Sequence, residues 1–441
     1  MKHIITFAIA FITISTFAQN KKWSLRDCVD YALENNITIK KSENSILIDD
    51  QNVVEAKSNF LPSVSGSLGQ RLNIGSGFDP VSNQRINNET THSFNYNLSV
   101  SQTIFNGFRN TNFYKQAQLN QETSKLELAK LKDDISLMVA NTYLNILFNK
   151  ERLEVAKAQY EFSSKQLDQV KDLVEAGVQP RANIIDVEAT LSSDSQNVTI
   201  AENNFNLALL QMSQLLQVPY QGFEVDIINI DEPSATLMYN DIDPILNYAM
   251  ANRNEIKIAE KNIENSEVGT EISKGGFLPT VTLGYGFGSV WSERETDFVK
   301  NPFFRELDLN KGHAFNLNVN IPIFSRFRNK TAVAKSIIFE ENAKLDLEQA
   351  KLDLESNIQT AFTDAQAALK AYVAAQKSLE SQELAFNNAK DRYDLGNLNA
   401  FELEQVRIRL INAQSSLINA KYDFVFKTKV LDFYIGKTIT L

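Results

Sequence analysis

Alternation of apolar and polar residues predicts β-strands at four places in the chain. In three of them every second residue is apolar and the residues between are small or polar. The apolar positions are Val281, Leu283, Tyr285 and Phe287, then Phe94, Tyr96, Leu98 and Val100, then Phe315, Leu317, Val319 and Ile321. Residues 64 to 68 keep a weaker version of the pattern. A period of two predicts strands with one apolar and one polar face.

Long helices are predicted after each pair of strands. Apolar residues recur every three or four positions between Leu347 and Leu379, as in a coiled coil. Gly177 followed by Pro180, and Gly396 followed by Asn399, mark the end of one helix and the start of the next. We therefore expect two long helical hairpins. A helix over 109–176 would be roughly 100 Å long at about 1.5 Å per residue, which no compact globular domain accommodates.

The chain repeats itself. Shifted by 217 residues, 31–64 matches 248–281 at 12 of 34 positions, including Phe-Leu-Pro at 60–62 and 277–279. At a shift of 219, Phe-Arg-Asn at 108–110 matches 327–329 and Gly177 matches Gly396. A tandem duplication explains both matches. We place the first repeat at 19–230 and the second at 231–441, each with a helix, a strand-loop-strand unit and a long helical hairpin.

Residues 1–18 are expected to be a secretory signal peptide. Lys2 precedes an apolar run that ends in Thr-Phe-Ala at 16–18, so the mature chain would begin at Gln19. The run is shorter than the ~20 apolar residues of a membrane-spanning helix. Cys28 is the single cysteine and lies too far from the cleavage site to carry a lipid anchor. We expect Cys28 to be an apolar helix contact, and any membrane embedding to use strands.

Charge and composition exclude several functions. The formal net charge of −10 and the absence of a run of five like charges argue against nucleic acid as a partner. His92 and His313 are expected at equivalent strand starts, with no carboxylate or thiol spacing beside them. We therefore expect no catalytic residues, no metal site and no cofactor, so the protein should not be an enzyme.

Strands of about nine residues with one lipid-compatible face fit an outer-membrane β-barrel. Four strands cannot close a barrel, and open edges in lipid leave backbone groups unpaired. Closure would therefore require other chains, and three copies would supply 12 strands. The alternative is a soluble sheet packed on helices, which would not need faces so cleanly sorted.

The ordered duplication resembles the TolC family of outer-membrane factors in tripartite efflux and type I secretion systems. The resemblance is based on the signal peptide, on Phe-Leu-Pro before a strand, on Phe-Arg-Asn after a strand, and on the glycines at the hairpin tips. The resemblance implies a membrane α+β fold: a homotrimeric channel with a 12-stranded outer-membrane β-barrel, four strands per protomer, and a long periplasmic α-helical barrel. Residues 218–243 and the last residues of the chain would form a girdle of mixed structure.

The resemblance also implies a function and partners. The protein would be a passive exit duct in the cell outer membrane, contacting its lipid, with a periplasmic extension. It would carry drugs, metal ions or polypeptides received from a periplasmic adaptor (membrane fusion) protein and an inner-membrane transporter. The alternative is a periplasmic adaptor or another non-catalytic helical envelope protein, but adaptors normally carry one hairpin and lack four such strands.

The same resemblance implies acidic rings at a periplasmic entrance beyond the tip glycines. The candidate entrance residues are Glu402, Glu404, Gln405, Asn183, Asp186 and Tyr393. The basic partner expected two residues after Gly396 is replaced by Leu398, so the family's closed-state network is not expected in full. Asn399 and Glu402 also fit a capping box, in which the carboxylate satisfies a backbone N–H. The two roles of Glu402 are not exclusive.

Two further groups of residues belong to this expectation. The hairpin tips, marked by Gly177, Pro180, Gly396 and Asn399, would contact the adaptor. The loops at 73–91 and 288–313 would face the exterior. The second loop contains aromatic residues that suit either an interfacial belt or a packed lid. These residues are Trp291, Phe298, Phe303 and Phe304.

Overall fold

The computed structural model describes residues 22–79, 81, 83–228, 239, 241–295 and 302–437. The expected signal peptide and Phe298 lie outside them. The chain divides into two compact units, and each unit draws on both sequence repeats. One, the sheet unit, comprises 41–129 and 254–352. The other, the hairpin unit, comprises the described residues up to Lys40, 130–253 and from Asp353 onward.

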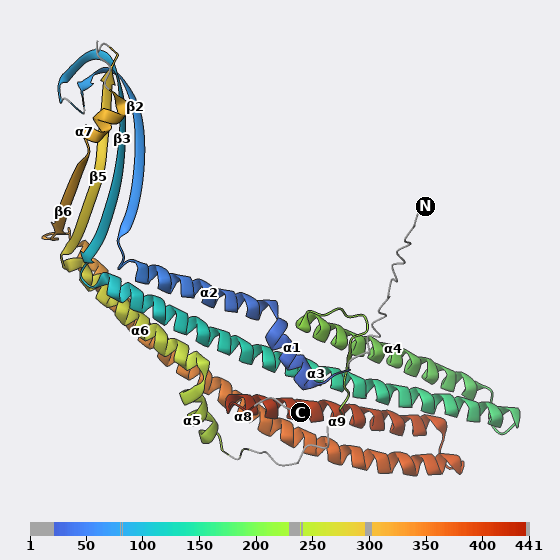
Figure 1. Ribbon diagram of the computed structural model, residues 1–441. Helices are drawn as coiled ribbons and strands as arrows, with labels where there is room; N and C mark the ends of the chain where they lie inside the picture. The colour runs from blue at the N-terminus through green and yellow to red at the C-terminus, as the bar shows by residue number, and fades with distance from the viewer. Residues whose placement is uncertain are drawn as a thin grey trace, which may run out of the picture. The chain divides into compact units, whose positions relative to one another are not determined.

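An antiparallel sheet of four strands organises the sheet unit (Figure 1). Its strands are β2 (Ser63–Phe78), β3 (Arg85–Phe105), β5 (Thr280–Arg294) and β6 (Gly312–Asn320), in the order β2-β3-β5-β6. One register row joins Val64, Val100, Tyr285 and Phe315, and the next joins Ser63, Ser101, Gly284 and Asn316. Since rows alternate between faces, the predicted sorting into one apolar and one polar face is confirmed.

Three strands are longer than predicted. β2, β3 and β5 have 16, 21 and 15 residues, and only β6 has the expected nine. Pairing of β2 with β3 continues to Phe78 and Arg85, past an irregularity between Gly75 and Gly77, so the loop predicted at 73–91 was wrong. The cause is that backbone pairing continues where side-chain alternation has already ended.

The second predicted loop, 288–313, is also partly structured. β5 continues to Arg294, and α7 (Phe303–Leu309) precedes β6. The ring of Phe303 lies 5.2 Å from the ring of Trp291 and 5.2 Å from that of Phe94, whereas Phe304 is exposed. Of the two predicted roles for these aromatic residues, the packing of Phe303 favours the lid.

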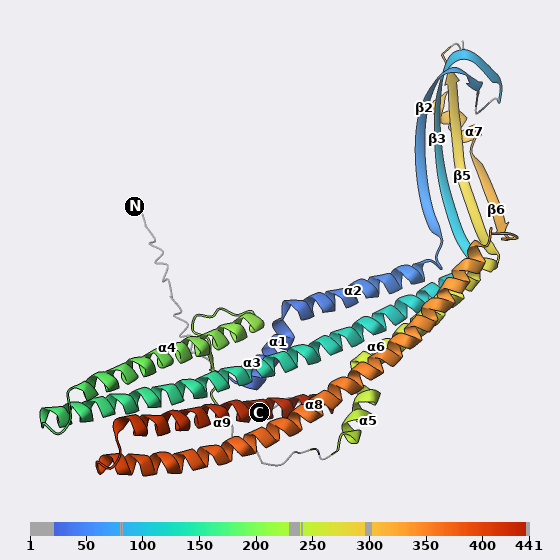
Figure 2. The same ribbon diagram turned by 180° about the vertical axis from the view of Figure 1, so that it is seen from behind.

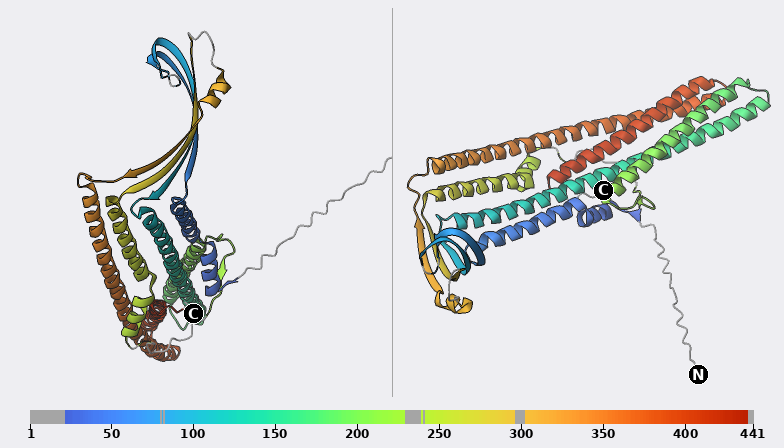
Figure 3. Two further views of the ribbon diagram at one scale, coloured as in Figure 1. Left: turned by 60° about the vertical axis from the view of Figure 1, so that its left-hand side comes forward. Right: turned by 90° about the horizontal axis from the view of Figure 1, so that it is seen from above.

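Four helices of the sheet unit lie side by side, in the order α2, α3, α6, α8 (Figure 3). They are α2 (Ile37–Ser58), the first part of α3 (Arg109–Glu175), α6 (Asn254–Lys274) and the first part of α8 (Arg328–Asp394). A short 3₁₀ turn, η1 (Gly275–Phe277), follows α6. Polar contacts join neighbours: Ser124 donates to Asp49 at 2.7 Å, Lys261 lies 3.0 Å from Glu122, and Thr270 donates to Glu340 at 3.4 Å.

Two long helical hairpins make up most of the hairpin unit (Figure 2). The rest of α3 runs to α4 (Ala182–Leu216), and the rest of α8 runs to α9 (Ala400–Tyr434). The expected stripe on α8 is buried at Leu354, Ile358, Ala361, Ala365, Ala368 and Tyr372. The heptad-like pattern thus describes real packing. Within the described residues, no helix combines the length and apolar character of a membrane span.

A small mixed region completes the hairpin unit. β1 (Lys22–Trp23) pairs in parallel with β4 (Glu224–Val225), beside α1 (Leu25–Asn35), while α5 (Asp243–Asn252) precedes α6. Cys28 is fully buried, as predicted for an apolar contact. The hydroxyl of Tyr143 donates to the backbone carbonyl of Asp226. Burial, together with the nearby Cys28 and acidic groups, raises the pKa of Tyr143. Residues 218–228, which belong to the predicted girdle, lie here.

Candidate functional site at the hairpin tips

Both hairpin tips turn through a glycine in the left-handed region. Gly177 has φ +73° and Gly396 has φ +72°, a conformation that a side chain disfavours. The N–H of Gly177 donates to the carbonyl of Val174 at 3.0 Å, and that of Val178 to Leu173 at 2.9 Å. This is a Schellman motif. The second tip repeats it, with Gly396 donating to Tyr393 at 2.9 Å and Asn397 to Arg392 at 2.8 Å.

The helices that follow the tips begin differently. The N–H of Glu402 donates to Oδ1 of Asn399 at 2.8 Å, and the N–H of Asn399 donates to Oε2 of Glu402 at 3.5 Å. The capping box predicted at α9 is therefore present. At α4 the capping position is Arg181, whose side chain makes no such bond. Glu402 remains exposed while it caps the helix, so its predicted role in an acidic ring stays a prediction.

The other predicted entrance residues fall into two groups. Gln405 and Asp186 are exposed on α9 and α4. Asn183 is half-buried and donates from Nδ2 to Oε1 of Gln179 at 3.2 Å, while its N–H donates to the carbonyl of Pro180 at 3.1 Å. Asn183 therefore serves the local turn. Within the hairpin unit, Gln405 and Asp186 keep their side chains at the surface.

Tyr393 lies beside the second tip rather than on an open surface. It is half-buried and lines a cavity of about 210 Å³ together with Phe162, Lys165 and Leu403. Residues of α3, α8 and α9 line this cavity. Tyr393 thus lies where the two hairpins of one chain meet.

Glu404 belongs to a buried ion cluster that the sequence analysis missed. Its two carboxylate oxygens accept from Nε and Nη2 of Arg407 at 2.7 and 2.9 Å. Nη1 of Arg407 donates to Asp194 at 3.0 Å and to the hydroxyl of Ser163 at 3.2 Å. Burial alone would lower the pKa of Arg407, but the hydrogen bonds and charges of Glu404 and Asp194 outweigh burial and raise it. Because Arg407 binds both of its carboxylate oxygens, Glu404 is not a free acidic group.

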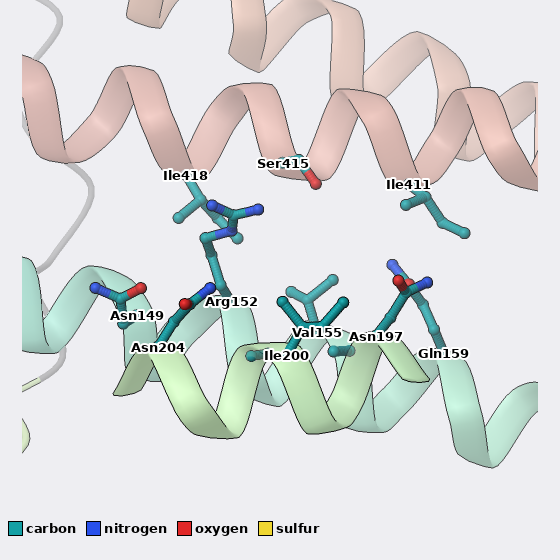
Figure 4. Close-up of a pocket in the computed structure, with 12 residues that line it drawn as sticks. Asn149, Arg152, Val155, Gln159, Asn197, Ile200, Asn204, Ile411, Ser415 and Ile418 are labelled. Carbon is teal, nitrogen blue, oxygen red and sulfur yellow. The ribbon is translucent and has the colours of Figure 1, made fainter. Parts of the chain in front are cut away.

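A second cavity, of about 230 Å³, lies farther from the tips (Figure 4). Side chains from α3, α4 and α9 line it, and most of the polar ones are amides. The labelled polar residues are Asn149, Arg152, Gln159, Asn197, Asn204 and Ser415. No carboxylate lies in this lining, and aliphatic side chains such as Val155 and Ile200 make up the rest of it.

The histidines do not form a site. Among the described residues, no group of His, Cys, Asp and Glu is arranged to hold a metal ion. His313 is the second residue of β6, and its Nδ1 lies 2.9 Å from the hydroxyl of Tyr285. His92 lies well inside β3, which begins at Arg85, so its prediction as a strand start was wrong. The cause is the extension of the β2–β3 pairing.

Comparison with known families decides the classification. The profile of the family described as outer membrane efflux protein matches residues 28–217 and 245–437. The chain belongs to this family. This outer membrane efflux protein matches the profile in two segments, one covering each long hairpin and the elements before it.

Relatives and solved structures agree with the assignment. Pyoverdine export outer membrane protein OpmQ of Pseudomonas putida is 23% identical over 83% of this outer membrane efflux protein and 74% of its own length. Outer membrane protein TolC of Vibrio cholerae is 21% identical over 70% and 69%. The crystal structure of CusC covers 94% of the chain and 92% of its own with a TM-score of 0.78 at 16% identity. That of VceC covers 94% and 97% with a TM-score of 0.76 at 15% identity.

These findings confirm the expected TolC-like family and fold. This outer membrane efflux protein is an outer-membrane component of export, as predicted, rather than a periplasmic adaptor. The family consists of channels and not of enzymes. The repeat boundaries stay a prediction, because residues 229–238, which include the junction at 230 and 231, lie outside the described residues.

Proposed function

We propose that three copies of this chain close into a passive exit duct through the outer membrane, which receives its cargo from a periplasmic adaptor and an inner-membrane transporter. The observation that carries the proposal is the four-stranded sheet. Its outer strands, β2 and β6, have no strand partner on their free edges within the described residues. An open, flat edge is a site for further strand pairing.

The faces of the sheet support embedding in lipid. Large apolar side chains on one face are strongly exposed in the single chain, with Leu68 at 78% and Phe315 at 80%. Exposed apolar surface of this extent needs an apolar environment. Because backbone groups in lipid must all be paired, β2 of one copy would pair with β6 of the next, giving 12 strands in three copies. The polar face would then line the duct.

The lining would carry little charge along most of its length. The polar face consists mainly of serine, threonine, asparagine and glycine, as register rows such as Ser65–Ser99–Gly286 and Thr103–Thr282–Asn318 illustrate. Selection by charge would then depend on the helical hairpins. We propose that Glu402 forms an acidic ring there, with Gln405, Asn183, Asp186 and Tyr393 nearby.

The support for Glu402 is its position and exposure. The capping box fixes Glu402 at the first turn of α9, and the side chain stays exposed while one carboxylate oxygen accepts from the N–H of Asn399. Three such carboxylates in a narrow pore would concentrate cations. Glu404 does not join this proposed ring, because Arg407 holds both its oxygens. The tips, with Gly177, Pro180, Gly396 and Asn399, are proposed to meet the adaptor.

Conductance across planar lipid bilayers tests the proposal. Purified protein should insert as discrete ion-conducting channels. A variant lacking residues 94–101, the middle of the inner strand β3, should neither insert nor form trimers, because the deletion breaks the pairing of β3 with β2 and β5. Stable, membrane-embedded trimers of the deletion variant would refute the barrel assignment. If the wild-type protein never conducts ions, the proposal that it forms a duct is refuted.

A further inference from the structure

The short helix α7 is attached to one face of the sheet (Figure 3). The ring of Phe303 lies 5.2 Å from the rings of Phe94 and Trp291, which are cross-strand partners in one register row. Ser289 lies two residues before Trp291 and thus on the same face. Its hydroxyl donates to the backbone carbonyl of Leu307 at 2.6 Å. An aromatic cluster and a hydrogen bond therefore hold α7 against strands β3 and β5.

The face under α7 is the apolar one. Trp291 is an even number of residues from Tyr285, whose register row carries Val100 and Phe315. Because side chains alternate between the faces of a sheet, Trp291 and Tyr285 share a face. This is the face that the proposed barrel turns toward lipid. β3 and β5 are the inner strands of the sheet, so these contacts of α7 leave the two outer strands available for pairing.

The register places α7 at the outer boundary of the lipid-facing band. β5 begins soon after α6 and η1, so in the proposed duct its far end, at Arg294, points to the exterior. The ten residue steps from Val281 to Trp291 span about 33 Å of strand at about 3.3 Å each. A strand tilt of about 40° turns this length into about 25 Å of height, which is the height of the lipid-facing band. The next row on this face pairs His92 with Glu293, so the apolar rows end at Trp291.

The side of α7 that points away from the sheet combines apolar groups with a free cation. Phe304 is 83% exposed and Leu309 is 64% exposed. Arg305 is also exposed, and it has no hydrogen bond or ion pair within the part of the chain that the structure describes. Large apolar side chains beside a basic one are typical of a helix at a membrane–water interface.

The acidic groups near α7 are already engaged. The carboxylate of Asp308 lies 2.6 Å from Nζ of Lys311. Glu306 is half-buried and accepts from Nδ2 of Asn310 at 3.5 Å, and the same nitrogen donates to the backbone carbonyl of Val290 at 2.9 Å. The uncompensated charge on the outward side of α7 is therefore positive, which suits an anionic partner.

We propose that α7 is an interfacial helix that binds anionic, phosphate-bearing lipid of the outer leaflet. The inference rests on the proposed barrel, because the apolar face must be in lipid for α7 to reach the interface. Phe304 and Leu309 would lie among acyl chains next to the headgroups, where aromatic side chains are favoured. The guanidinium of Arg305 would bind a phosphate, whose oxygens match its planar set of donors.

Single-cysteine labelling tests the position of α7. Cys28 is the one native cysteine and is fully buried, so it should not react in the folded protein. Phe304→Cys reports on α7, Leu283→Cys on the apolar face of β5, and Asn97→Cys on the polar face. Each variant carries an environment-sensitive fluorophore in nanodiscs of phosphatidylcholine. Quenching is measured with brominated lipid and, separately, with aqueous iodide.

Brominated lipid should quench the labels of Phe304→Cys and Leu283→Cys, and iodide should quench that of Asn97→Cys. Quenching of Phe304→Cys by iodide alone would overturn the interfacial position. Protection from both quenchers would overturn it too, because protein, such as a second copy, would then cover α7. Loss of lipid quenching at Leu283→Cys would instead refute the proposed function. Leu309→Cys repeats the test if Phe304→Cys disturbs the helix.

Arg305→Gln tests the recognition of phosphate. Nanodiscs of phosphatidylcholine and phosphatidic acid are made with bromine on one lipid or on the other, and the ratio of quenching at Phe304→Cys gives the local enrichment of the anionic lipid. Arg305→Gln should lower this enrichment about fivefold. Arg409→Gln, at an exposed position of α9, is the matched control and should leave it unchanged. Equal enrichment with and without Arg305 would overturn the phosphate contact.

Discussion

The two helical hairpins have one backbone design and two different chemistries. Their first helices both have 67 residues and their second helices both have 35. Both tips end in the same Schellman motif at Gly177 and Gly396. The helix lengths and turns thus match between the two repeats even where the residues differ. A left-handed turn accepts few residues other than glycine, which explains why these positions match across the repeat.

The charged side chains, unlike the backbone, differ between the two hairpins. The first turns of α9 carry Glu402, Glu404 and Arg407, whereas the equivalent positions on α4 carry Asn183, Ile185 and Glu188. Only α9 has a side-chain cap and supplies the cation of a buried cluster. Helix length and turns thus define the scaffold, while a few side chains decide which hairpin contributes the helix cap, the buried cation and the exposed charge.

The largest expected effect comes from breaking the buried cluster of Arg407, Glu404, Asp194 and Ser163. Arg407→Ala leaves Asp194 buried without its countercharge and should lower the free energy of unfolding by about 3–5 kcal/mol. Denaturant unfolding of the detergent-solubilised protein measures it. Arg409→Ala, two residues away and exposed, is the matched control and should change stability by less than about 0.5 kcal/mol. Equal losses in the two variants would show that Arg407 does not join the hairpins.

Adding a side chain should destabilise the two hairpin tips by the same amount. Nothing lies within 4 Å of a Cβ added at Gly177 or Gly396, so Gly177→Ala and Gly396→Ala test the backbone alone. Each should cost about 1–2 kcal/mol, the cost of left-handed conformation for an L-residue. Thermal unfolding measures both. Gly269→Ala, also in open space but inside α6, should stabilise by up to about 1 kcal/mol. A clearly larger loss at one tip would contradict the shared design.

A smaller loss should distinguish the helix starts. Asn399→Ala removes the cap of α9 and should cost about 1 kcal/mol. Arg181→Ala, at the equivalent start of α4, removes no capping bond and should be close to neutral. Hydrogen exchange of the first turns of α9 and α4 would report the difference locally. Loss of protection at α4 in Arg181→Ala would contradict the contrast between the hairpins.

The smallest stability effect should accompany a change in selectivity. Glu402→Gln keeps a residue that can cap at this position, so stability should change by less than about 0.5 kcal/mol. Removal of three luminal charges should nevertheless weaken cation selectivity, measured as the reversal potential in a salt gradient. Gln405→Glu, on the same helix and exposed, should strengthen it. Unchanged reversal potentials in Glu402→Gln would leave Glu402 with its capping role only.

Local patterns predicted much of this molecule because they are properties of neighbouring residues. The strand faces, the helix stripe through Ile358, the tip glycines and the capping box at Asn399 all follow from short-range spacing. Strand ends were predicted poorly, because pairing of β2 with β3 depends on a partner strand and not on alternation. The buried ion cluster was missed because Ser163, Asp194 and Arg407 meet only through helix packing. Its one local signal was the three-residue spacing of Glu404 and Arg407.

We propose that one chain supplies a third of a closed channel. Native mass spectrometry of the protein extracted from outer membranes in detergent tests it most directly, because it counts chains without assuming any contact. We expect a complex of three chains, each with the mass of residues 19–441. A monomer that remains fully inserted in the membrane, with both edges of its four-stranded sheet unpaired, would contradict it.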